Sequence, residues 1–185
     1  MKKRIIIGLF SCLVLIQIVT PLLMIGKREA VLKNGKQFKF KTAPVDPFDA
    51  FRGRYVALRI ESDSAPKPGN IEFDYGQKVY AHITKDKQGF ATFSVATAQR
   101  PQGVDYLTTT VRYSYSKDKV FLDMPFDRYY MGEEAAPAAE KAYRQHSRQK
   151  SKDAYVTVRI KSGFAVLEEL YVGGKPILEF LEQSQ

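Results

Sequence analysis

The sequence has few of the residues that bind metals, form cross-links or act as nucleophiles. Its one cysteine, Cys12, lies in an apolar N-terminal run, so we expect no disulfide and no thiolate site in the rest of the chain. The two histidines, His82 and His146, have no second histidine or cysteine at ligand spacing. We therefore predict no metal site and no cofactor.

Complete catalytic motifs are also missing. The chain has no G-x-S-x-G serine motif, and residues 42–61 contain no serine that could serve a membrane-bound serine–lysine protease. Gly173-Gly174-Lys175 is too short for a phosphate-binding loop and has no predicted helix after it, so it is interpreted as a turn. The sequence thus assigns no catalytic residue.

Most of the chain lacks an excess of either charge. The formal net charge is +9, but residues 1–41 carry +8 of it and residues 42–185 carry only +1. A nucleic-acid-binding domain would have the basic excess on its own surface. We therefore expect no nucleic-acid partner, and we expect the basic residues near the N-terminus to lie at a membrane surface.

One long apolar run is present, from Ile5 to Gly26. As a helix it would be about 33 Å long, which matches the hydrocarbon thickness of a bilayer. We interpret residues 1–26 as an uncleaved signal anchor whose partner is the lipid bilayer. A cleaved signal peptide would need a shorter apolar core and a small-residue cleavage site. A lipoprotein would need a small-residue box before Cys12, where Phe10 stands instead.

Residues 27–43 form a basic neck beside this span. Asn34-Gly35 separates two β-prone runs and predicts a type I′ hairpin, and Phe38 and Phe40 are expected to share its inner face. Each cation near anionic headgroups can contribute about 1 kcal/mol to membrane binding. Four cations of the neck are the candidate membrane-surface residues: Lys27, Arg28, Lys33 and Lys36.

Residues 44–185 are dominated by short alternating runs between turn residues. A strand is predicted at 54–61, and the predicted hairpins pair 78–84 with 90–97, 106–115 with 120–124, and 155–160 with 164–172. A helix is predicted in this part of the chain only at 133–149, and it should begin near Ala136. We expect the side chains of Ile177, Leu178 and Phe180 to pack the C-terminal tail against the domain. The predicted fold class is mainly β: an N-terminal transmembrane helix followed by one antiparallel β-rich domain with a single short helix.

The most distinctive segment runs from Pro44 to Ile60. Two prolines around an aspartate favour an extended path, and a glycine between two arginines favours a turn before the strand. This segment resembles the GDYXXLXY domain family, whose members have a Pro-x-Asp-Pro approach, a Phe-Arg-Gly pair and then the signature. Arg54 stands where the family has aspartate, and Ile60 stands where it has its last tyrosine. The matching residues are Pro44, Asp46, Pro47, Phe51, Arg52, Gly53, Tyr55 and Leu58.

The resemblance implies a membrane-anchored bacterial protein, often encoded beside a polytopic membrane protein. Lys2, Lys3 and Arg4 favour a cytoplasmic N-terminus, although more cations follow the span. We therefore expect a single-pass protein of the bacterial cytoplasmic membrane with an extracytoplasmic C-terminal domain. A polytopic membrane protein is the expected partner.

Three functions are compatible with these residues. The first is a protein-binding or membrane-complex module, favoured by the anchor, the basic neck and the missing catalytic motifs. The second is a membrane-tethered hydrolase that uses Asp46 or Asp49 with Arg52, although nearby arginines would keep both carboxylates ionised and aspartate after proline usually forms turns. The third is a small-ligand or lipid-binding domain, which would need an apolar cavity of at least about 300 Å³.

The family motif is interpreted as a folding device, with Phe51, Tyr55 and Leu58 entering the core and Gly53 supplying a backbone conformation that a Cβ would resist. We expect Gly53→Val to lower the free energy of unfolding by about 1–3 kcal/mol. Thermal unfolding of the purified variant checks this, and an unchanged melting temperature would refute the role assigned to Gly53.

Overall fold

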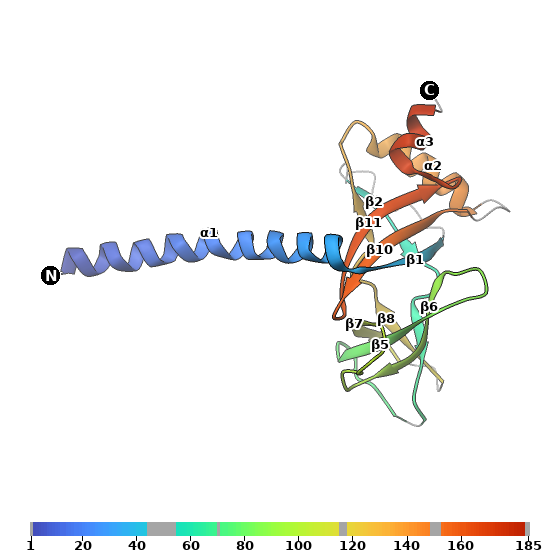
Figure 1. The fold of residues 1–185 in the computed structure, drawn as a ribbon, viewed down its shortest axis with the longest axis horizontal. Helices are drawn as coiled ribbons and strands as arrows, with labels where there is room; N and C mark the ends of the chain where they lie inside the picture. Colours follow the sequence, from blue (N-terminus) through green and yellow to red (C-terminus); the bar gives the residue numbers. More distant parts are fainter. Residues whose placement is uncertain (1, 44–54, 70, 115–117, 149–152, 184–185) are drawn as a thin grey trace.

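The computed structural model describes residues 2–43, 55–69, 71–114, 118–148 and 153–183. It confirms the mainly antiparallel β fold with an apolar N-terminal helix, which projects from one side of the β-rich part (Figure 1). Two sheets of five strands, ordered β12-β11-β10-β1-β3 and β4-β8-β7-β5-β6, are accompanied by the pair β2-β9. The strand bounds are β1 Lys36–Ala43, β2 Tyr55–Ala57, β3 Arg59–Ile60, β4 Ser64–Pro66, β5 Lys78–Lys85, β6 Ala91–Thr97, β7 Tyr106–Tyr113, β8 Lys119–Asp123, β9 Arg128–Tyr130, β10 Tyr155–Lys161, β11 Phe164–Val172 and β12 Lys175–Pro176.

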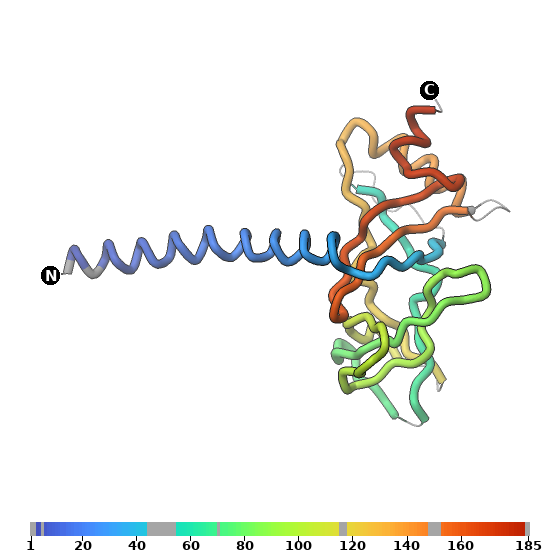
Figure 2. The backbone as a smooth tube through the Cα atoms, viewed as in Figure 1, coloured from blue at the N-terminus to red at the C-terminus, as the bar shows by residue number. Residues whose placement is uncertain are grey.

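Helix α1 (Lys2–Asn34) continues eight residues beyond the predicted end of the span. It contains one stretch, Ile6–Asn34, that is long and apolar enough to cross a membrane, and an 18-residue window within it has a mean hydropathy of 2.4. Figure 2 shows that the backbone passes from this helix directly into β1. Thr20 Oγ1 donates to the carbonyl oxygen of Ile16, and Pro21 lies inside the helix.

The hairpin predicted at Asn34-Gly35 is wrong. A type I′ turn needs positive φ at both central residues, and neither residue has it. The helical pattern instead persists to Asn34, helped by the i,i+4 pair of Glu29 and Lys33 at 3.8 Å. Gly35 then ends the helix, and its N–H donates to the carbonyl oxygen of Val31 at 2.7 Å.

The junction of α1 with β1 is held by side chains from the sheet. Arg159 Nη1 donates to the carbonyl oxygen of Gly35 at 3.2 Å, while its Nε donates to Glu168 Oε1 at 2.9 Å. Gln37 Nε2 donates to the other carboxylate oxygen of Glu168 at 2.6 Å. An arginine at a helix C-terminus also complements the negative end of the helix dipole. We call Gly35, Gln37, Arg159 and Glu168 the junction clamp.

Strand β1 lies between β10 and β3 in the first sheet. Its register with β10 runs from Lys36 opposite Ile160 to Lys41 opposite Tyr155. Phe38 and Phe40 are buried on one face, which confirms the predicted alternation. The helix therefore continues into an interior strand of the sheet, and it also packs against β10 and β11.

The second sheet contains the two hairpins predicted around residues 85–89 and 116–119, and the predicted hairpin β10–β11 is present in the first sheet. One hydrophobic core joins the sheets: the ring of Phe40 lies 6.0 Å from that of Phe93 and 5.1 Å from that of Phe126. The β10–β11 turn also reaches the second sheet, because Thr108 N–H donates to the carbonyl oxygen of Gly163 at 2.9 Å.

Two predictions at the C-terminal end need correction. Helix α2 (Ala136–Arg148) begins where it was expected, but a further helix, α3 (Ile177–Gln183), follows Gly174 and Lys175. Its seven residues give too few turns for a clear helical pattern. Ile177 is buried, whereas Leu178 is exposed and does not pack the tail as predicted. Phe180 packs edge-on against His146, with 5.1 Å between the ring centres.

The predicted strand at 54–61 is divided into β2 and β3. The two strands have different partners, because β2 pairs with β9 and β3 pairs with β1. Between them, Leu58 N–H donates to the carbonyl oxygen of Asp127 at 2.8 Å. The chain thus crosses from one pairing to the other at Leu58.

Gly35 should be sensitive to any side chain. A Cβ there would collide with the carbonyl oxygen of Val31 and lie 3.2 Å from both Arg159 Cβ and Ile160 N. We expect Gly35→Ala to lower the free energy of unfolding by about 1–3 kcal/mol, measured by thermal unfolding of the full chain in detergent. Gly132→Ala is the matched control, since a Cβ at Gly132 meets no atom within 4 Å. Equal melting temperatures for the two variants would contradict the tight junction.

Candidate interaction site beside the N-terminal helix

Most of the predicted family-motif site lies outside the described residues: Pro44, Asp46, Pro47, Phe51, Arg52 and Gly53, together with Asp49 and Arg54. Leu58 is buried with 6% of its surface exposed, as predicted. Tyr55 is not in the core, because Val56 takes the inward position and successive strand residues face opposite sides. The Tyr55 ring instead lies 5.6 Å from that of Tyr130 and 5.3 Å from the guanidinium carbon of Arg128.

The four predicted basic residues fall into two pairs. Lys33 interacts with Glu29, and Lys36 forms an ion pair with Asp105 of the β6–β7 loop. Lys27 places Nζ 4.2 Å above the ring centre of Phe164, and Arg28 lines a groove beside α1. Lys27 and Arg28 thus each border a recess at the exit of the apolar run.

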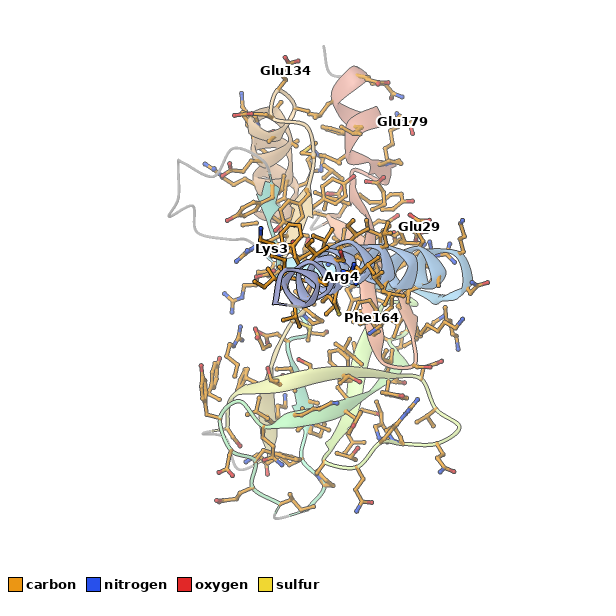
Figure 3. The ribbon with its side chains drawn as sticks, turned by 90° about the vertical axis from the view of Figure 1, so that its left-hand side faces the viewer. Lys3, Arg4, Glu29, Glu134, Phe164 and Glu179 are labelled. Atoms are coloured by element: carbon orange, nitrogen blue, oxygen red, sulfur yellow. The ribbon has the colours of Figure 1, made fainter. Side chains whose placement is uncertain are left out.

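The groove lies between α1 and strands β9 and β11, with a volume of about 570 Å³. Ile25, Arg28, Glu29 and Leu32 form its helical wall, and their spacing places them on one face of α1. The other wall contains residues 125–130, and its floor is formed by residues 165–168. We call this recess the helix groove. Figure 3, viewed along α1, shows Glu29 on the opposite side of the helix from Phe164.

The polar side chains of the helix groove are fixed by hydrogen bonds. Burial acts to raise the pKa of Glu168, but hydrogen bonds from Gln37 and Arg159 outweigh it, so this pKa lies below its ordinary value. Burial, together with a 2.6 Å hydrogen bond from Tyr129 Oη to Glu169, raises the pKa of the Tyr129 hydroxyl. Glu168 is therefore ionised and the Tyr129 hydroxyl is protonated at neutral pH.

Tyr130 is the most exposed aromatic residue of the helix groove, with 66% of its surface accessible. A basic residue and two tyrosines occur together in β9, and Ile25 of the apolar run lines the same recess. Tyrosine and arginine are both suited to the boundary between lipid and water. Sequence reasoning missed this group, and the consecutive Arg128-Tyr129-Tyr130 was the signal that could have identified it.

The described residues contain no cluster of three or more His, Cys, Asp or Glu side chains that could hold a metal ion. Within the same residues, His82 Nε2 lies 3.3 Å from Thr97 Oγ1, and His146 Nδ1 lies 2.8 Å from Asp153 Oδ1. Both histidines thus have local partners. The helix groove is lined by charged as well as apolar side chains, which differs from the apolar cavity that a small-ligand-binding domain would need.

Comparison with known proteins gives one clear relationship. A search of curated proteins found no match, and a search of solved structures found none either. The family model described as "GDYXXLXY protein" matches residues 17–170, a range that includes the end of the apolar run, the second sheet, the first sheet without β12 and the end of β11, and the walls of the helix groove. The chain therefore belongs to the GDYXXLXY protein family.

Proposed function

We propose that this chain is a single-pass protein of the bacterial cytoplasmic membrane whose extracytoplasmic β-domain binds a polytopic membrane protein. The observation that carries the proposal is the position of the helix groove. Its wall includes Ile25, inside the apolar run, and Leu32, seven residues further along the same helix. A groove that begins at bilayer level is placed to receive a segment that emerges from the membrane beside α1.

The absence of a hinge supports this proposal. Residues 27–34 of α1 rise about 12 Å above the apolar run at 1.5 Å per residue, and β1 begins immediately after Gly35. The junction clamp then fixes the angle between helix and sheet. A partner in the same membrane would therefore meet the groove at a set height, without the entropic cost of ordering a flexible linker.

The surface chemistry of the groove also fits a protein partner. Arg28, Glu29 and Arg128 surround apolar and aromatic side chains, and exposed Tyr130 stands beside Tyr55. Tyrosine and arginine are enriched at the centres of protein interfaces. Charges of both signs at the rim would select the register of the bound segment.

The hydrolase alternative depends on Asp46, Asp49 and Arg52, which lie outside the described residues. It predicts that Asp46→Asn and Asp49→Asn variants lose function while they stay folded. The binding-module proposal instead places the functional surface on α1, β9 and β11.

Site-specific photo-crosslinking in living cells tests the docking site. A photoreactive residue at Tyr130 or Leu32 should give one dominant adduct with an integral membrane protein, since both positions line the groove. The control position is Lys87 in the β5–β6 turn. This turn lies near Lys41, toward the end of β1 that is farther from α1. Arg28→Glu should reduce the adduct from Tyr130 several-fold. An equal adduct at Lys87, or adducts with lipid alone, would contradict the proposal.

Cysteine labelling tests the topology. Because Cys12 is the only cysteine, Cys12→Ser combined with Lys87→Cys gives a single label site in the β-domain. We expect a membrane-impermeant maleimide to label this variant in intact cells after the wall is opened. Labelling only in inverted vesicles would place the domain in the cytoplasm and overturn the proposed localisation.

A further inference from the structure

A second recess adjoins the helix groove, and the linings of the two recesses share Pro125 and Ala165. It has a volume of about 280 Å³, and its lining brings together residues from α1, β5, β7 and the β10–β11 turn. We call it the lysine niche and define it by Lys27, Lys78, Thr108, Ser162 and Phe164. We propose that the lysine niche binds the phosphate headgroup of an anionic phospholipid of the phosphatidylglycerol class. The inference takes the membrane anchoring of α1 proposed above as its starting point.

The depth of the niche favours a lipid as the source of the phosphate. Lys27 directly follows the apolar run that ends at Gly26. Its Nζ lies above the ring of Phe164, so the β10–β11 turn lies at the level where the helix leaves the hydrocarbon. Phospholipid phosphates occupy this level, and cations beside them gain about 1 kcal/mol each.

The charge of the niche favours an anion. Among the described residues, no carboxylate forms an ion pair with Lys27 or Lys78, whereas Lys33, Lys36 and Lys41 each have a carboxylate partner. Lys27 and Lys78 both line the recess, with Lys27 Nζ above the Phe164 ring and Lys78 Nζ 5.7 Å from the ring centre of Tyr80. Two cations at one recess attract an anion, which would also offset their mutual repulsion. Thr108 and Ser162 add hydroxyl donors of the kind that phosphate oxygens accept.

The backbone of the niche carries a residue in an unfavourable conformation. Ser162 has φ +50° and is followed by Gly163 with φ +80°, so both central residues of the β10–β11 turn have positive φ. Glycine, asparagine or aspartate would adopt the first position at lower cost. Gly163 cannot be replaced easily, because a Cβ would collide with Thr108 Oγ1 and the ring of Tyr106. The turn therefore packs closely against β7 through Gly163, and Ser162 lines the same recess as Lys27 and Lys78.

The experiment uses the full chain in detergent micelles. The sequence has no tryptophan, so Phe164→Trp adds a single fluorescent reporter that keeps an aromatic ring under Lys27. A short-chain phosphatidylglycerol is titrated while the emission from position 164 is followed. The parallel titrations use a short-chain phosphatidylcholine, as the lipid without net charge, and inorganic phosphate, as the free anion.

We expect a saturable response to phosphatidylglycerol that weakens as salt increases. Adding Lys27→Gln and Lys78→Gln to the reporter variant should weaken the apparent affinity about tenfold or more, because both cations of the niche are lost. Lys87→Gln is the matched control, since it removes an exposed lysine from the distant β5–β6 turn and should leave the affinity unchanged.

Three outcomes would overturn the inference. An equal response to phosphatidylcholine would show that charge is not recognised, and an unchanged affinity in the double variant would show that the lysines are not the site. Saturation by inorganic phosphate at the same concentration as the lipid would assign the niche to the free anion. Each of these outcomes is separate from the crosslinking result, which reports on Leu32 and Tyr130, because these two residues line the helix groove and not the lysine niche.

Discussion

The structure depends on how α1 enters the sheet at Gly35. The carbonyl of Gly35 accepts a hydrogen bond from Arg159, which is itself held by Glu168, and buried Val31 packs the last helical turn into the domain. The strand that follows is paired on both sides, by β10 and by β3. A change in the angle of the helix would therefore pull on an interior strand and on the clamp, both of which resist it through hydrogen bonds and burial.

Both recesses depend on this fixed angle, because each has one wall on α1 and the other on the β-domain. A flexible linker in place of residues 27–35 would let the domain sample many heights and orientations above the bilayer. In that arrangement, Ile25 could not form a stable groove with β9, and Lys27 could not stay above Phe164. The junction is thus the physical reason why the chain presents two defined surfaces at the point where the helix leaves the apolar run.

The hairpins were predictable from sequence because alternation and turn residues coincide, as in β5–β6 and β10–β11. Asn34-Gly35 misled the same reasoning, since a glycine can end a helix as well as form a turn, and the local sequence does not say which helical residues are buried. Tyr55 was placed in the core although Leu58, three positions away, cannot share its face in a regular strand. The groove could not be predicted from sequence, because the tertiary fold alone brings together the three segments that line it, residues 25–32, 125–130 and 165–168.

The basic neck shows why position within the helix matters more than net charge. Four cations look equivalent in sequence, yet Lys33 and Lys36 form ion pairs with carboxylates, while Lys27 and Arg28 border two adjoining recesses. Adjacent residues of a helix differ by about 100° around its axis. Lys27 and Arg28 can therefore serve two recesses at once only when the helix meets the sheet at one particular rotation. The junction clamp and buried Val31 together hold that rotation, so the chemistry of both surfaces follows from the way the end of the helix is fixed to the sheet.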